Sequence, residues 1–135
     1  MTPVDKSPEP VDKSPEPVDK SPEPVEGPTD PEDVKIITLA RSALARTRSR
    51  QGGCLRDTDG RTYAGTSVEL DHLKLSAIQV VVAMAVSSGA QGVEAVALAG
   101  SDDPTGDDVR AIGDLAGGPA AVRIWLTDEQ GNVRG

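Results

Sequence analysis

Aromatic residues and cysteine are both scarce in this 135-residue chain, which has one tryptophan, one tyrosine, no phenylalanine and one cysteine. The single cysteine, Cys54, excludes an intrachain disulfide and fits a reducing compartment. A long apolar segment is also missing, because the most apolar run, residues 77–86, is shorter than the roughly 20 residues that cross a bilayer. Polar residues and proline follow Met1, so no signal peptide is expected. We therefore predict a cytoplasmic protein that does not enter a membrane.

Negative charge is concentrated at one end of the chain. The first 33 residues contain ten acidic residues and three lysines, whereas residues 34–135 contain twelve acidic residues and eleven Lys and Arg. The larger part is close to neutral and lacks the basic surplus that binds phosphate backbones. Arg41, Arg46 and Arg48 do cluster, but no aromatic residues alternate with them, and cations suit the end of a helix. We expect no nucleic-acid partner.

The amino-terminal segment repeats one heptapeptide, VDKSPEP, three times, at residues 4–10, 11–17 and 18–24. Two prolines in every seven residues exclude a coiled coil, because proline lacks an amide donor and clashes with helical carbonyl groups. Burial of the few apolar residues in this segment would not compensate the chain entropy lost on folding. Residues 1–33 are therefore expected to be a disordered tail. The tail is interpreted as a solubilising spacer or, since Ser7, Ser14 and Ser21 each precede proline, as a repeated docking or phosphorylation site for a protein partner.

The remaining sequence alternates helical and strand patterns. Pro31, Glu32 and Asp33 are typical of a helix start, and Ile36, Ile37, Ala40 and Leu44 follow on one helical face. Further segments are predicted as a hairpin with its turn at residues 57–60, a buried helix over 76–88, a strand over 93–99, a helix over 107–115 and a strand over 121–126.

A hairpin followed by right-handed crossovers indicates a three-layer α-β-α fold with a mixed sheet. We predict an α/β domain over residues 34–135 with four to five strands. Whether a fifth strand follows Trp125 is left open, because few residues remain.

Several local sequences, in the same order, resemble the cytidine deaminase family over most of residues 35–126. Residues 51–55 and 59–61 are similar to that family's V-G-A-A-L and D-G-R, and residues 67–69 to its N-V-E. Residues 73–79 and 85–89 align with L-T-V-C-A-E-R and K-A-V-x-x-G, and residues 104–108 with P-C-G-x-C. The resemblance implies a zinc site, a glutamate that transfers protons, and a ribose-binding pair.

This sequence departs from the family at each catalytic position. The resemblance places the zinc ligands at Ser76, Thr105 and Asp108, the proton-transferring glutamate at Ile78, and the ribose-binding pair at Ser67 and Glu69. Hydroxyl groups are poor zinc ligands, and an aliphatic side chain transfers no proton. We therefore predict no catalytic residue and no cofactor, with zinc expected only if the protein is a deaminase with a divergent site.

Other candidate groups are few. His72 is the only histidine, so neither a dyad with Cys54 nor a multi-histidine site is well supported. The aspartates at 102, 103, 107 and 108 suit a hard cation, but the Thr105-x-x-Asp108 spacing is that of a capping box, which we prefer.

The favoured hypothesis is a catalytically inactive binding or assembly module. Family members commonly assemble as dimers or tetramers, which implies a homo-oligomer here, with the apolar segment 77–86 near the subunit contacts. The alternatives are a nucleoside deaminase and a nucleoside-binding sensor.

Overall fold

The computed structural model describes residues 27–118 and 122–135. The three VDKSPEP repeats, and the prediction of a disordered tail made for them, lie outside the described residues. Helix α1 (Pro31–Thr47) begins three residues before the domain boundary expected at residue 34. Its N-cap is Asp30, whose carboxylate accepts a hydrogen bond from the Glu32 amide at 2.9 Å.

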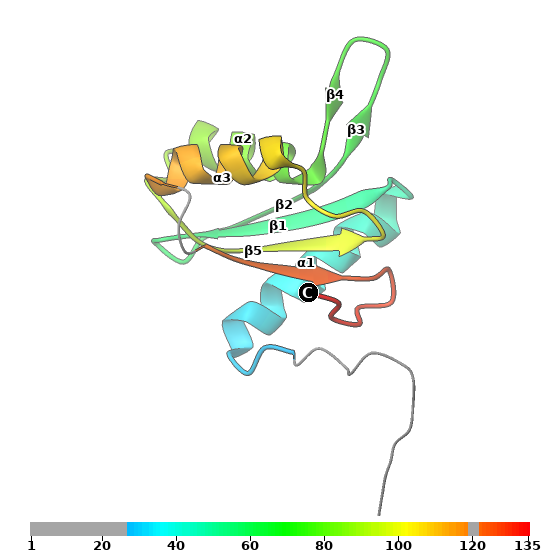
Figure 1. Ribbon diagram of the computed structural model, residues 1–135, viewed down its shortest axis with the longest axis horizontal. Helices are drawn as coiled ribbons and strands as arrows, with labels where there is room; N and C mark the ends of the chain where they lie inside the picture. The colour runs from blue at the N-terminus through cyan, green and yellow to red at the C-terminus, as the bar shows by residue number, and fades with distance from the viewer. Residues whose placement is uncertain (1–26, 119–121) are drawn as a thin grey trace, which may run out of the picture.

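The other elements follow in the predicted order, with one short addition. They are β1 (Gln51–Asp57), β2 (Thr62–Thr66), β3 (Val68–Glu69), β4 (Lys74–Leu75), α2 (Ala77–Ser87), β5 (Val93–Gly100), α3 (Gly106–Ala116) and β6 (Arg123–Thr127). The additional pair β3–β4 forms an antiparallel hairpin that projects from the body of the domain (Figure 1). We did not predict it, because two residues per strand carry no readable alternation.

The main sheet is mixed and has the strand order β2-β1-β5-β6. Strand β1 is antiparallel to both β2 and β5, whereas β5 and β6 are parallel. Helix α1 covers one face and helices α2 and α3 cover the other, which confirms the predicted three-layer α/β fold (Figure 1). Within the described residues no fifth strand joins this sheet, and only a single bridge links Thr127 to Val133.

Two glycines in β1 allow the helices to approach the sheet from both sides. A Cβ atom at Gly52 would collide with the carbonyl oxygen of Ala40 in α1. A Cβ atom at Gly53 would lie 3.2 Å from the Cβ of Ala77, the first residue of α2. Because glycine has no side chain, these two positions allow α1 and the start of α2 to lie close to the central strand.

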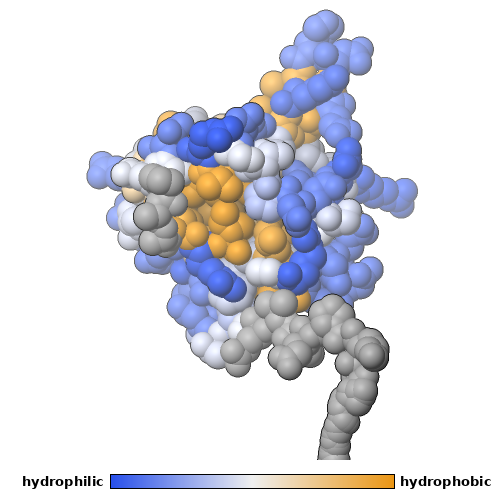
Figure 2. Space-filling model, in the orientation of Figure 1, coloured by the Kyte–Doolittle hydropathy of each residue, from blue (hydrophilic) through white to orange (hydrophobic). Residues whose placement is uncertain are grey.

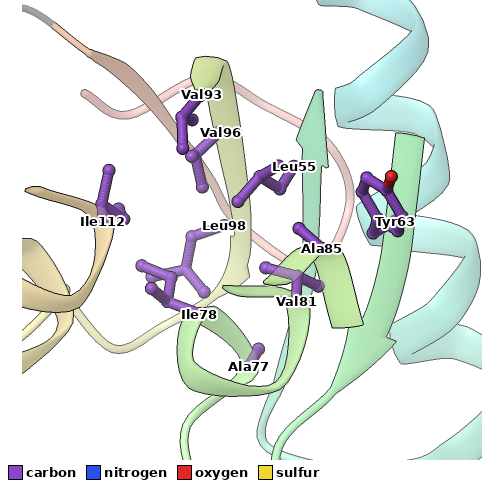
Figure 3. Close-up of a cluster of buried hydrophobic side chains, with 10 residues drawn as sticks. All are labelled: Leu55, Tyr63, Ala77, Ile78, Val81, Ala85, Val93, Val96, Leu98 and Ile112. Atoms are coloured by element: carbon purple, nitrogen blue, oxygen red, sulfur yellow. The ribbon is translucent and has the colours of Figure 1, made fainter. Parts of the chain in front are cut away.

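Two apolar clusters form the core, one on each side of the sheet. The cluster under α2 and α3 contains Leu55, Ile78, Val81 and Leu98, all fully buried (Figure 3). The cluster under α1 contains Cys54, and burial raises the pKa of its thiol to about 11.

None of the helices within the described residues combines the length and the apolar character that a membrane crossing requires.

The hairpin between β1 and β2 is organised by the buried carboxylate of Asp57. It accepts hydrogen bonds from the amides of Asp59 and Arg61 and from the hydroxyl of Tyr63, each at 2.9 Å. Burial by itself would raise the pKa of Asp57, but these three donors outweigh that effect and hold the pKa below its ordinary value. Gly60 has φ +87° in this turn, so the predicted Asp-Gly hairpin is confirmed.

Replacing Asp57 by Asn should lower the free energy of unfolding by about 2 kcal/mol at pH 7, because an amide cannot serve all three donors. A carboxyl whose pKa is lowered by folding stabilises the protein above its unfolded pKa of about 3.9 and loses that effect as the pH falls. The difference between wild type and Asp57→Asn, measured by urea unfolding with Trp125 fluorescence, should therefore shrink from pH 7 to pH 3. Asp59→Asn, at an exposed position in the same turn, is the matched control and should change little. A pH-independent difference would contradict this role for the ionised carboxylate.

Candidate functional site

The three positions at which the resemblance expects zinc ligands meet where helices α2 and α3 begin. Ser76 is the N-cap of α2 and Thr105 is the N-cap of α3. Each forms a capping box with the residue three positions later, Gln79 in α2 and Asp108 in α3. Tertiary structure thus brings together two helix starts that are 29 residues apart in the sequence.

The carboxylate of Asp108 joins the two helix starts. Its Oδ1 accepts a hydrogen bond from Ser76 Oγ at 2.6 Å, and its Oδ2 accepts one from the Thr105 amide at 3.0 Å. The Asp108 amide in turn donates to Thr105 Oγ1 at 3.1 Å. Asp108 is only 1% exposed, so its charge is held by donors from both helix ends rather than by water.

These donor atoms do not fit zinc. Ser76 Oγ accepts from the Gln79 amide at 3.1 Å while it donates to Asp108, and Thr105 Oγ1 accepts from the Asp108 amide. Both hydroxyl groups and both carboxylate oxygens are therefore engaged within the protein. Zinc in proteins is held by thiolate, imidazole and carboxylate groups, and one carboxylate does not replace three such ligands. Among residues 27–118 and 122–135, no group of three or more His, Cys, Asp or Glu is placed to hold a metal ion.

Ile78, at the position where the resemblance expects the glutamate, is fully buried in the core. Figure 3 shows it beside Leu98 and near Ile112, in the cluster between α2, α3 and the sheet. Ile78 does not line the hollow described next. Its side chain therefore contributes packing and has no group that could move a proton.

A hollow of about 730 Å³ opens beside the two helix starts. Its lining comprises Arg50, Gln51, Ser67, Val68, Glu69, Lys74, Leu75, Ser76, Asp102, Asp103, Thr105 and Asp108. All five of the predicted polar site residues are in this list, so the fold gathers them around one space. The chain's two aromatic residues, Tyr63 and Trp125, are buried elsewhere, and the lining has no ring on which a nucleobase could stack.

The two residues of the predicted ribose-binding pair differ in how well the surrounding protein fixes their side chains. Ser67 Oγ accepts a hydrogen bond from the Gln51 amide at 3.1 Å, and Gln51 Oε1 accepts one from the Ala77 amide at 3.1 Å. This chain of contacts connects β1, the start of α2 and Ser67. Glu69 is exposed and lies 3.8 Å from Arg50.

Arginines that the sequence did not single out hold the rim of the hollow. Arg50 pairs with Asp102 at 3.0 Å, and Arg134 pairs with Asp103 at 2.5 Å and donates to the carbonyl oxygen of Asp102 at 2.6 Å. Arg134 lies near the end of the printed sequence, and no local motif marks it as part of a site. The fold of residues 128–134 places Arg134 beside the hollow, and local sequence patterns do not predict that fold.

The remaining sequence candidates do not form a second site. His72 is exposed in the turn between β3 and β4, whereas Cys54 is buried under α1. The four aspartates are divided among separate partners: Asp102 and Asp103 as above, Asp107 with Arg110 at 2.7 Å, and Asp108 with the helix caps. The capping-box interpretation of Thr105 and Asp108 is confirmed.

One comparison with known proteins identifies a family. The family model described as "Cytidine deaminase-like" matches residues 29–131. A search of curated proteins found no match.

Several solved structures with a similar fold are cytidine deaminases. The enzyme from Burkholderia pseudomallei is 23% identical, with a TM-score of 0.63 over 74% of this chain and 87% of that chain. The enzyme from Mycobacterium leprae is 19% identical, with a TM-score of 0.56 over 74% of this chain and 89% of that chain. The enzyme from Mycobacterium tuberculosis is 23% identical, with a TM-score of 0.55 over 68% of this chain and 80% of that chain. At these identities the likeness concerns the fold alone.

Replacing Asp108 by Ala should lower the free energy of unfolding by about 2–3 kcal/mol, because it removes half of the α3 capping box and leaves the Ser76 hydroxyl without its buried acceptor. Asp107→Ala is the matched control, since the Asp107 side chain is 77% exposed and its ion pair should contribute less than about 0.5 kcal/mol. Urea unfolding followed by circular dichroism measures both. Equal losses in the two variants would show that Asp108 does not join the helix starts.

Proposed function

This chain belongs to the cytidine deaminase-like family, and from that premise we propose that it is a non-catalytic member that acts as a binding or assembly module. The observation that carries the proposal is the hydrogen-bonded group Ser76, Thr105 and Asp108 at the positions where a deaminase needs zinc ligands. In this interpretation the family fold is kept as a scaffold for recognition. A protein with one buried thiol, Cys54, suits the reducing cytoplasm, where we place it.

Deamination requires two things that these side chains do not supply. Zinc lowers the pKa of a bound water so that it attacks the base, and a glutamate carries the proton between that water and the base. Here the ligand positions hold two alcohols and one engaged carboxylate, and the glutamate position is the buried Ile78. These side chains therefore supply neither a means to activate water nor a group that transfers the proton.

Assembly with further copies is the module function that the surface supports best. Met84 and Val86 of α2 are 38% and 56% exposed, so the central apolar helix keeps apolar side chains at the surface. Figure 2 shows a second apolar area below α3, over the edge of the sheet where β6 lies and where Val122, Ile124 and Leu126 are only partly buried. Exposed apolar areas of this kind mark protein contacts, which supports a homo-oligomer, a dimer or tetramer. The tail would then offer a separate site for a protein partner.

A nucleoside-binding sensor is the second candidate, and the hollow favours it. Ser67 and Glu69 line that space, and a hydroxyl and a carboxylate suit the hydroxyl groups of a ribose. The absence of an aromatic ring from the lining argues for the module over the sensor.

Purified protein should contain far less than the roughly one zinc per chain that a deaminase needs, and it should not deaminate cytidine. Elemental analysis and the change in ultraviolet absorbance of cytidine, measured on one preparation, test this. Stoichiometric zinc together with turnover would overturn the proposal and establish a deaminase with a divergent site. Calorimetric binding of cytidine without turnover, weakened by Glu69→Gln, would establish the sensor instead.

The triple variant Ser76→Cys, Thr105→Cys, Asp108→Cys should gain about one zinc per chain, because the three positions converge on one place. The double variant that keeps Asp108 is the control and should bind zinc at least tenfold more weakly. Zinc content and the thermal midpoint with and without metal report the gain. A triple variant that folds by circular dichroism yet takes up no zinc would show that these positions do not correspond to a ligand set.

A further inference from the structure

A groove runs along helix α1, on the face of the sheet opposite the candidate site. It consists of two hollows of about 210 and 400 Å³ that share Arg41. Val34, Ile37 and Val133 line the first hollow, and Leu44, Arg48 and the loop residues Glu129 and Gln130 line the second. We call this surface the α1 groove. Its lining combines apolar side chains with two arginines and one glutamate.

Arg41 lies between the two hollows and is incompletely satisfied. Its Nε is buried and has no hydrogen-bond partner in the part of the chain that the structure describes. The loop can lie this close because residue 131 is glycine with φ +96°, and a Cβ there would come within 2.5 Å of that Nε. No ion pair within the described ranges includes Arg41 or Arg48. A cation removed from water without an anion is unfavourable, so the groove is suited to a carboxylate.

The chain itself leads an acidic segment to this groove. Pro28 lines the smaller hollow, and a Cβ at Gly27 would lie 3.7 Å from Val133. The residues that precede Gly27, 18–26, contain three acidic residues against one lysine, together with two valines and two prolines. A segment attached at the groove is present there at an effective concentration in the millimolar range, so weak contacts suffice for occupancy.

The spacing of the acidic residues matches that of the arginines. A proline-rich extended chain advances about 3.1 Å per residue, which would place Glu23 and Glu26 about 9 Å apart. Arg41 and Arg48, seven positions apart, are separated by about 10 Å at the helical rise of 1.5 Å per residue. Val25, between the two glutamates, would supply an apolar side chain to pack on Leu44 and Ala45 of the lining.

We propose that residues 18–26 dock within the same molecule in the α1 groove, with Glu26 paired to Arg41 and Glu23 paired to Arg48. The repeat nearest the domain then serves as an internal ligand, and the two repeats before it extend from the docked segment. Docking covers Arg41 and Arg48, the two arginines of the groove lining. This proposal is independent of whether the family site binds zinc or nucleosides.

The test compares full-length chains that differ only in the position of a charge reversal in the tail, which leaves the folded domain untouched. Glu23→Lys with Glu26→Lys removes the proposed contacts, and Glu9→Lys with Glu16→Lys is the matched control of identical composition. Heteronuclear ¹⁵N NOE values report the order of Val25 relative to Val4. The amide shifts of Gly131 and Val133 and the Nε–H signal of Arg41 report the groove.

In wild type and in the control, the NOE of Val25 should be at least twice that of Val4, and it should fall at least twofold in the Glu23→Lys, Glu26→Lys chain. The groove signals should shift in that variant alone. On the domain side, Arg48→Glu should act likewise, whereas Arg46→Glu, outside the groove lining, should not. Unchanged Val25 and groove signals in the Glu23→Lys, Glu26→Lys chain would overturn the proposal. So would groove shifts that depend on protein concentration, because the occupant would then be a second copy.

Discussion

The buried carboxylate of Asp108 connects two helix starts, and the geometry of the candidate site depends on that connection. It accepts from Ser76 at the beginning of α2 and from the Thr105 amide at the beginning of α3. Helix starts carry unpaired amide groups and partial positive charge, so two of them facing each other need an anion between them. A carboxylate that belongs to the chain meets this need without any bound group.

This arrangement explains how the fold can persist with a donor set that does not suit zinc. The resemblance to zinc-dependent cytidine deaminases would put metal ligands at the same two helix starts, where the metal would link α2 to α3. Here capping boxes and the Ser76–Asp108 hydrogen bond link the helices. Ile78, which the resemblance aligns with the family's glutamate, is fully buried and contributes apolar packing to the domain.

Much of the fold could be predicted because its signals are local. The face formed by Ile36, Ile37, Ala40 and Leu44 is buried as its helical spacing indicated, and the Asp-Gly turn forms the β1–β2 hairpin. The cap at Thr105 followed from its distance to Asp108. By contrast, the β3–β4 hairpin, the contact between Ser76 and Asp108, and the clamp that Arg134 places on the rim were missed. Each of these features is stabilised by contacts with residues that are distant in the sequence, so local patterns do not predict it.

The sequence by itself determined most of the helices and strands and which of their faces are buried, since propensity, periodicity and capping act over a few residues. Only the tertiary structure decided that Ser76, Thr105 and Asp108 satisfy one another, that five polar candidates surround one hollow, and that Pro28 and Arg41 line the same hollow beside α1. The physical reason is that a hydrogen bond or ion pair requires atoms within about 3 Å. Folding of the chain brings such atoms together, and the spacing of residues in the sequence does not predict which atoms will meet.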